Sequence, residues 1–384
     1  MEQVSLFDKE IYKEPYAMFK RWRNESPIVF DSERNTYGIT RYADVMNAFR
    51  SPDLFTSSLG ARANSIAQPF MIDADDPSHR EQRRVVERAF TPGQMAFYED
   101  SVRKTVNESI KKMPHGEPFD IVKLLTQPLP VITVGKILGV PESDYGLLQK
   151  WGASMVEGAD GWENVTDDVV SSVLEWFEYF DNYAKNKTQR SDGDLISLLL
   201  NAHYAEKIIS YEEARGNALA LLVGGNETAR YLLTGALQEL LSRRAVWEKL
   251  FLDKELINSA IDECVRFVSP AVSSIRNTTT DVKVGDYAIP KNSQVMLLIS
   301  SANRDESVFS NPDDFDINRP KTQSMGFGFG IHYCIGSNLA RMQLRLVIEE
   351  LLRVVPSISI VDGFKPEMKY STFLRGPKSL KVVI

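Results

Sequence analysis

Cysteine is scarce in this sequence, since Cys264 and Cys334 are the only two among 384 residues. A disulfide framework needs several pairs of cysteines, and a zinc or iron–sulfur site needs several thiolates from one chain. Both kinds of site are therefore excluded. A cysteine with a chemical role in this chain must act alone.

Long apolar runs, linkers and excess positive charge are lacking as well. The most apolar window, residues 218–223, is far too short to span a bilayer, and residues 1–9 have neither the basic start nor the apolar stretch of a signal peptide. No Gly/Ser-rich or Pro-rich tract interrupts the chain, and its net charge of −7 would repel nucleic acid. We therefore expect a single domain over residues 1–384, cytoplasmic and monomeric, with no affinity for nucleic acid or membranes.

The pattern of apolar residues predicts a mainly α protein with small β-sheets. Strands are expected at 28–30 and 37–39, and helical spacing runs from Pro77 to about Val268, with breaks at 128–130, 158–161 and 191–194. A loop at 57–70 precedes this region. A β-rich stretch at 282–299 and an irregular segment at 303–330 follow it. A last long helix is expected at 335–355, and the tail reads as strands with a turn around Gly376 and Pro377. This layout differs from alternating βαβ units.

The segment from Phe327 to Gly336 is the most informative part of the sequence. Its glycines allow positive φ angles and a close approach to a flat ligand, and Cys334 comes just before a helix whose free N–H groups would stabilise a thiolate. A buried cysteine that packs as a small hydrophobe is the alternative. The glycine spacing does not fit a dinucleotide-binding loop, and a c-type haem would need a second cysteine and a following histidine.

This segment resembles the haem-binding loop of the cytochrome P450 family, Phe-Gly-x-Gly-x-His-x-Cys-x-Gly, with every position filled. The resemblance implies the P450 fold and a haem b held by Phe327, Gly328 and Gly336, with Cys334 as the axial ligand of its iron. It also implies a monooxygenase that inserts oxygen from O2 into a small, mostly hydrophobic substrate. Electrons would come from a ferredoxin or flavodoxin on the Cys334 side of the haem, and from NAD(P)H only indirectly.

Glu263 and Arg266 lie three residues apart and so share a helix face. Read alone, they form a surface ion pair of little value. Beside the cysteine loop they resemble the family's Glu-x-x-Arg pair, and Arg319 matches its third member. The resemblance implies a buried charge network that fixes the loop. Cys264, within the same helix, is expected to be ordinary packing.

Four cationic residues are expected to bind the haem propionates. His79 and Arg83 are four residues apart and project together, which suits one carboxylate. They resemble the family's His-x-x-x-Arg helix, and Arg276 and His332 match the remaining partners. Any one of these residues alone would more often be an ordinary surface residue.

Gly224 and Gly225 stand inside a predicted helix, where each glycine costs about 1 kcal/mol relative to alanine. They could thin the helix wall for dioxygen and loosen its hydrogen-bond ladder. Glu227 and Thr228 resemble the family's acid–alcohol pair, in which Thr228 would hydrogen-bond bound dioxygen and Glu227 would relay protons. Gly224 departs from the family, where alanine is usual.

The substrate and partner surfaces carry weaker signals. Family position implies substrate contacts from the following residues: Ile66, Phe70, Ala220, Leu221, Gly224, Ala271, Val272 and Phe373. The region 151–180 is expected to form a mobile roof. Two basic stripes, Arg80-Arg84-Arg88 and Arg341-Arg345, would serve as a docking surface or would be ordinary charged helix faces.

Two alternatives to this function stay open at the level of sequence. One is a peroxide-driven haem-thiolate enzyme, or an isomerase or dehydratase of the same fold, against which the acid–alcohol pair argues. The other is a haem-based sensor without turnover.

Overall fold

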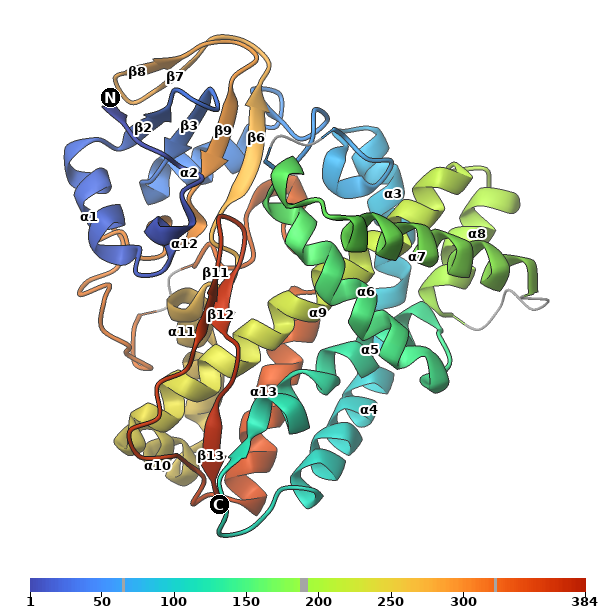
Figure 1. The fold of residues 1–384 in the computed structure, drawn as a ribbon, viewed down its shortest axis with the longest axis vertical. Coiled ribbons are helices and arrows are strands. Elements are labelled where there is room, and N and C mark those ends of the chain that lie inside the picture. Colours follow the sequence, from blue (N-terminus) through green and yellow to red (C-terminus); the bar gives the residue numbers. More distant parts are fainter. Residues whose placement is uncertain (64–65, 187–192, 321–322) are drawn as a thin grey trace. The chain divides into compact units, whose positions relative to one another are not determined.

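The computed structural model, drawn in Figure 1, describes residues 1–63, 66–186, 193–320 and 323–384. These residues form two compact units. Unit 1 contains residues 1–55, 99–129 and 228–384, and unit 2 contains residues 56–98 and 130–227. Each unit is thus assembled from segments that are far apart in the sequence. Helices α4 (Pro92–Lys111), α5 (Pro128–Leu138) and α9 (Tyr211–Ser242) contribute residues to both. The expectation of a single domain stays a prediction.

The largest sheet belongs mainly to unit 1, with strand order β1-β2-β3-β9-β6-β4. Its strands are β1 (Glu2–Gln3), β2 (Ile28–Asp31), β3 (Thr36–Ile39), β9 (Gln294–Leu297), β6 (Ser274–Thr278) and β4 (Phe55–Thr56). Strands β2 and β3 form an antiparallel hairpin, and β3 pairs in parallel with β9, so that Thr36 lies opposite Gln294. The strands predicted at 28–30 and 37–39 are confirmed.

Helix α2 (Tyr42–Arg50) packs against this sheet with the residues that its 3.6-residue period places on one face. Val45 and Phe49 on the helix join Ile39 and Leu297 of the sheet in one buried cluster, which also contains Met325. Met325 begins the segment that leads to Cys334. The core of unit 1 therefore reaches the start of the predicted haem loop.

The other helices of unit 1 are mostly where the sequence predicts them. They are α1 (Tyr16–Glu25), α10 (Arg244–Leu252), α11 (Ile257–Val268), α12 (Ile299–Ala302) and α13 (Ser337–Val354), with a π-helical segment at Val122–Thr126 and short 3-10 turns at Lys9–Tyr12, Lys254–Leu256 and Gly330–His332. The last helix starts two residues later than expected. Small sheets are formed by β7 (Val282–Val284) with β8 (Tyr287–Ile289), and by β5 (Phe119–Asp120), β13 (Lys381–Val383) and β10 (Ser359–Ile360).

The turn predicted around Gly376 and Pro377 is wrong. Both residues lie in strand β12 (Arg375–Pro377), which pairs with β11 (Met368–Tyr370) in the hairpin labelled in Figure 1. The glycine has a different purpose, because a Cβ at this position would lie 2.5 Å from the side chain of Tyr231. Gly376 thus permits a close approach between a strand and a helix.

Unit 2 is mostly helical, with α3 (Ser78–Glu87), α6 (Tyr145–Glu157), α7 (Asp167–Asn186) and α8 (Leu195–Tyr204) as its complete helices. Its short 3-10 turns are Met71–Asp73, Arg88–Phe90, Glu142–Asp144, Gly158–Asp160 and Trp162–Asn164. The helix expected to open at Pro77 is α3. In the part of the chain that the structure describes, no helix combines the length and the apolar character needed to cross a membrane.

The three predicted helix breaks have different outcomes. The break at 158–161 is confirmed, because Gly161 has a φ of 119° and ends a 3-10 turn. Residues 128–130 do not interrupt a helix but form the first turn of α5, where a proline needs no N–H partner. Of the break at 191–194, residues 191–192 lie outside the described residues, and Asp194 caps α8 by accepting from the Ser197 N–H at 2.9 Å.

Candidate functional site

The loop that carries Cys334 is held against two helices of unit 1 by glycines. A Cβ at Gly326 would lie 2.7 Å from Val265 of α11, and a Cβ at Gly330 would overlap the carbonyl oxygen of Phe49 at the end of α2. Gly330 also has a φ of 71°, which side chains other than glycine rarely adopt. These two glycines therefore let the loop backbone lie directly on its supports.

Cys334 lies at the exposed end of this loop, two residues before α13 reaches its N-cap at Gly336. Its N–H donates to the carbonyl of Phe327 at 2.9 Å, and its own carbonyl accepts from Ser337 N–H at 3.3 Å. The loop is thereby closed across its base. Cys334 thus precedes a helix N-terminus, where free N–H groups favour negative charge.

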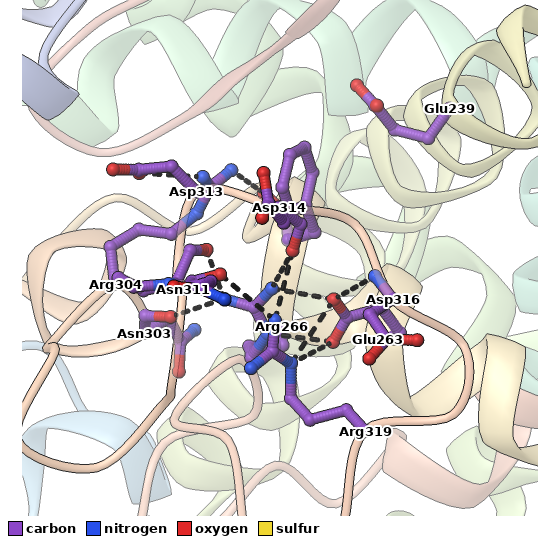
Figure 2. A network of polar contacts seen from close by, with 12 residues as sticks. Glu239, Glu263, Arg266, Asn303, Arg304, Asn311, Asp313, Asp314, Asp316 and Arg319 are labelled. Carbon is purple, nitrogen blue, oxygen red and sulfur yellow. Dashed lines mark hydrogen bonds and ion pairs between the residues drawn. The ribbon is translucent and has the colours of Figure 1, made fainter.

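Glu263, Arg266 and Arg319 form one buried network, shown in Figure 2. Arg266 donates to both carboxylate oxygens of Glu263 at 2.8 and 2.6 Å, and Arg319 donates to the same carboxylate at 3.2 and 3.4 Å. The side chains of Glu263 and Arg266 are each 2% exposed. The interpretation of Glu263 and Arg266 as a surface pair is thus wrong, and the network is a buried one.

Asn303 connects this network to the cysteine loop. Its backbone carbonyl accepts from Arg266 Nη1 at 2.9 Å, while its side-chain oxygen accepts from the Met325 N–H at 2.6 Å. Arg266 also donates to the carbonyl of Pro312 at 2.8 Å, so it fixes the irregular segment from both sides. The sequence offered no signal for Asn303, because a lone asparagine in an apolar stretch has no recognisable pattern.

The residues of unit 1 fit a haem. Gly328 has open space where a side chain would stand, and a Cβ at Gly336 would meet only the Cys334 sulfur, at 3.9 Å. Arg276 is buried and donates to two neutral acceptors, Ser274 Oγ at 3.0 Å and the Ile275 carbonyl at 2.6 Å. A buried guanidinium is a group that can bind a carboxylate such as a propionate. An exposed thiol, a glycine-lined surface and a buried cation are the groups that a thiolate-ligated haem with propionates requires.

His332 and Phe327 lie in the same loop as Cys334. His332 is half-buried and ends the 3-10 turn Gly330–His332. The ring of Phe327 lies 6.4 Å from that of Tyr333 and 5.3 Å from the guanidinium of Arg341. The Phe327 ring is thus packed between a second aromatic side chain of the loop and an arginine of α13.

In unit 2, His79 and Arg83 project from α3, as the four-residue spacing predicted. His79 is buried, and this burial lowers the pKa of its imidazole, although the Asp76 carboxylate 3.4 Å away opposes the shift. Arg83 is half-buried and donates to Glu87 at 2.7 Å. The helix therefore presents a buried imidazole and a guanidinium one turn apart.

The two adjacent glycines of α9 differ from each other. A Cβ at Gly225 would lie 2.7 Å from Val134 of α5, so this glycine allows two helices of unit 2 to pack closely. Gly224 is exposed and has open space around its Cβ position. Glu227 is buried, and Thr228 is half-buried. Helix α9 continues unbroken across this region, so the expected loosening does not interrupt it.

The predicted substrate-contacting residues differ widely in how much of their surface is exposed. Ile66 is 67% exposed, whereas Phe70 is buried beneath the guanidinium of Arg62, 5.1 Å from its ring centre. Ala220 is 9% exposed and so has little free surface. Three other predicted contacts are half-buried: Leu221, Ala271 and Phe373. Val272 has no exposed surface and packs in the core, which removes it from the candidate pocket residues.

The two basic stripes are largely neutralised. On α3 and the turn after it, Arg80 lies 3.7 Å from Asp76, and Arg88 lies 2.6 Å from Glu206. On α13, Arg341 pairs with Asp262, and Arg345 lies 2.9 Å from Glu99 and 3.1 Å from Glu349. Among the described residues, Arg84 alone of the five has no acidic partner within ion-pair distance. The sequence pattern therefore overstated the positive charge of these faces.

Comparisons with known proteins give one consistent result. The family model for Cytochrome P450 matches residues 159–384. A steroid C26-monooxygenase from Mycolicibacterium smegmatis is 32% identical over 94% of this chain and 91% of its own length, and a linalool 8-monooxygenase from Pseudomonas putida is 32% identical over 100% of this chain and 99% of its own. A Bacillus megaterium P450 solved in complex with testosterone superposes with a TM-score of 0.88 at 31% identity, covering 97% of this chain and 98% of that one.

Proposed function

This chain belongs to the cytochrome P450 family, and from that premise we propose which of its residues carry out the monooxygenase reaction. The enzyme uses haem b, dioxygen and reducing equivalents from redox partners to oxidise a small organic substrate. The observation that carries the assignment is the exposed Cys334 thiol at the end of a loop closed by its own N–H and anchored on two helices.

We assign to Cys334 the role of holding the haem iron through its sulfur. When bound, the haem supplies the activation of dioxygen, which a thiolate ligand promotes by donating electron density. Thr228 holds a proton at Oγ1 for delivery to dioxygen, and the Glu227 carboxylate takes up protons that come from solvent. Arg276 and His332 from unit 1, and His79 and Arg83 from unit 2, neutralise the propionates.

The substrate is small and mostly apolar, and its contacts include Ile66, Leu221 and the open position at Gly224. Half-buried apolar side chains and the absence of a Cβ at Gly224 support this proposal. A cytoplasmic location, a monomeric state and a single domain stay predictions from the sequence.

The thiolate assignment is tested by Cys334→His. The reduced, carbon-monoxide-bound wild type should show the absorbance band of thiolate-ligated haem, and the variant should lose it while still binding haem. Cys264→Ser is the matched control, because Cys264 is completely buried and burial raises its pKa well above the usual value. Survival of the band in the Cys334 variant would show that another group ligates the iron.

We further propose that the electron donor is an acidic ferredoxin or flavodoxin that docks on the Cys334 side of the haem. Arg84 supports an acidic donor, since it is exposed and has no acidic partner within ion-pair distance among the described residues. Electrostatic steering would make the encounter sensitive to salt.

Arg84→Glu should slow reduction by a ferredoxin at low ionic strength and weaken its dependence on salt. Lys283→Glu changes an equally exposed cation on β7 and should leave both unchanged. Equal effects of the two variants would refute a specific docking role for Arg84. Arg345 is unsuitable for this test, because its reversal would also break its ion pairs with Glu99 and Glu349.

A further inference from the structure

A buried polar cluster in unit 2 joins the 66–73 loop and α3 to the distant helix α9. Asn217 of α9 is 0% exposed, and Gln82 of α3 is 2% exposed. The Asn217 side chain accepts from the Met71 N–H at 3.1 Å, and its amide nitrogen donates to Gln82 Oε1 at 2.7 Å and to the Glu213 carbonyl at 2.7 Å. One side chain therefore binds the 66–73 loop, α3 and α9 together.

The orientation of both amides is fixed by their neighbours. Gln82 gives its oxygen to Asn217 and its nitrogen to Ser78 Oγ at 3.0 Å and to the Glu213 carboxylate at 2.9 Å. Turning either amide over would set oxygen against oxygen or nitrogen against an N–H donor. The cluster is thus specific for one arrangement of the loop backbone, whereas an apolar contact would tolerate several.

A second feature fixes the same loop to the same helix turn. A Cβ at Gly216 would overlap the carbonyl oxygen of Pro69 and lie 3.3 Å from Cβ of Phe70. The loop backbone therefore rests directly on α9, one residue before Asn217. The close contact at Gly216 and the hydrogen bond to Asn217 are independent of each other, and both specify the same position of the loop backbone.

The docked segment is also held together internally. The carboxylate of Asp73, which is 5% exposed, accepts from the Gln68 N–H at 2.9 Å, the Ala61 N–H at 3.0 Å and Arg62 at 2.6 Å. The Asp73 carboxylate thus ties the two ends of the 68–73 segment to each other and to residues 61 and 62. The latch at Asn217 and Gly216 positions this segment, along with the exposed Ile66 that precedes it.

We propose that Asn217, with Gly216, is a specificity-determining latch that sets the position of the 66–73 loop and thereby the size of ligand that the enzyme accepts. This inference rests on the proposed function, in which Ile66 and its loop contact the substrate. Asn217 acts through the loop and is a positioning residue. Without the latch the loop is no longer held in place before binding. A ligand large enough to touch the loop then binds more weakly, because part of its binding free energy is lost in ordering the loop.

The test uses two haem-iron ligands of different size on the haem-loaded enzyme. Imidazole should bind Asn217→Leu and Gly216→Ala with a Kd within about twofold of the wild type, because it binds through its nitrogen and lacks the phenyl ring that makes 4-phenylimidazole the larger ligand. The Kd of 4-phenylimidazole should rise about tenfold, equivalent to about 1.4 kcal/mol. Gly93→Ala is the control, since that exposed helical glycine has nothing within 4 Å of its Cβ position.

Hydrogen exchange at the Met71 amide gives a readout that does not depend on the haem. Exchange should accelerate at least about tenfold in Asn217→Leu, whose side chain cannot accept the hydrogen bond, and should stay unchanged in Gly93→Ala. If Asn217→Leu does not fold, Gly216→Ala carries the test alone, because it displaces the loop without removing the amide.

An unchanged ratio of the two dissociation constants in the folded variants would overturn the latch, as would an unchanged Met71 exchange rate in Asn217→Leu. Failure of the proposed function looks different. In that case the wild type itself would bind neither azole through iron, while the exchange at Met71 would still respond to Asn217→Leu.

Discussion

Replacing Arg266 by methionine should cost the enzyme about 4 kcal/mol of unfolding free energy, because breaking a buried ion pair from one side costs about 3–5 kcal/mol. The variant leaves the 2%-exposed Glu263 carboxylate with Arg319 as its cationic partner in the network. It also removes the donor that Arg266 supplies to the carbonyls of Asn303 and Pro312. The Asn303 connection to Met325 then loosens, so the variant should retain less haem in its thiolate-ligated form.

The assay is urea unfolding of the haem-loaded protein, followed by tryptophan fluorescence and by the carbon-monoxide band of the reduced enzyme. Arg353→Met is a closely matched control. Arg353 also pairs with a glutamate three residues earlier, Glu350, at 2.5 Å, but its side chain is 62% exposed. Glu350 itself is 4% exposed, but it keeps Arg103 as a second cationic partner at 2.6 Å. Because an ion pair with an exposed cation contributes at most about 1 kcal/mol, this control should lose less stability than Arg266→Met.

Two results would refute the reasoning. The first is an equal loss of stability in Arg266→Met and Arg353→Met, which would mean that burial of the network contributes nothing. The second is an intact carbon-monoxide band in a strongly destabilised Arg266→Met, which would separate the network from the cysteine loop. Adding Glu263→Gln to Arg266→Met should recover part of the lost stability, because the 2%-exposed position 263 then carries no charge that Arg319 alone must neutralise.

Three further predictions concern single positions. Gly330→Ala should abolish haem binding, because position 330 has a φ of 71° and a Cβ there would overlap the Phe49 carbonyl. Gly328→Ala should lose only about 1 kcal/mol of folding stability, because its φ of 69° is strained but the space around it is open. The haem content of the two purified variants compares them. Burial raises the pKa of Tyr98 to about 12, so between pH 10 and 12 the unfolded chain loses a proton that the folded chain keeps, and stability falls as pH rises. Tyr98→Phe should flatten this alkaline loss in urea titrations, and an unaltered slope would contradict the role of Tyr98. Thr228→Ala should lower product formed per NADH consumed while peroxide-driven turnover persists, and unchanged coupling would rule out Thr228 as the proton donor.

Much of the fold and of the cysteine site could be predicted from local pattern. The β-branched and aromatic residues of β2 and β3 and the periodic apolar residues of α13 define their own elements. The cysteine loop is likewise a continuous segment, so its glycines, Cys334 and the following helix are all visible in ten residues. Glu263 and Arg266 share one helix turn, which made their pairing predictable, and the burial of their side chains followed from the family resemblance and not from the spacing alone.

Features that depend on distant segments could not be predicted in the same way. Gly376 looked like a turn residue because the side chain that demands a glycine, Tyr231, lies in another helix. The arginines of α13 looked like a positive surface because Asp262 and Glu99 come from elsewhere in the chain. Asn217 stood in an apolar helix without any recognisable motif, since its partners are brought to it only by folding.

The interleaving of the two units has a consequence for how the protein is made. Strand β3 pairs with β9, and Thr36 and Gln294 are 258 positions apart along the chain. During synthesis from the N-terminus, every residue of unit 2 is available before β9 exists, whereas unit 1 also needs β13 at the end of the chain. The nascent hairpin of β2 and β3 must therefore keep an unpaired strand edge for most of translation, which is the state in which such edges aggregate. A ribosome that stalls before residue 294 releases a chain whose first sheet cannot be completed.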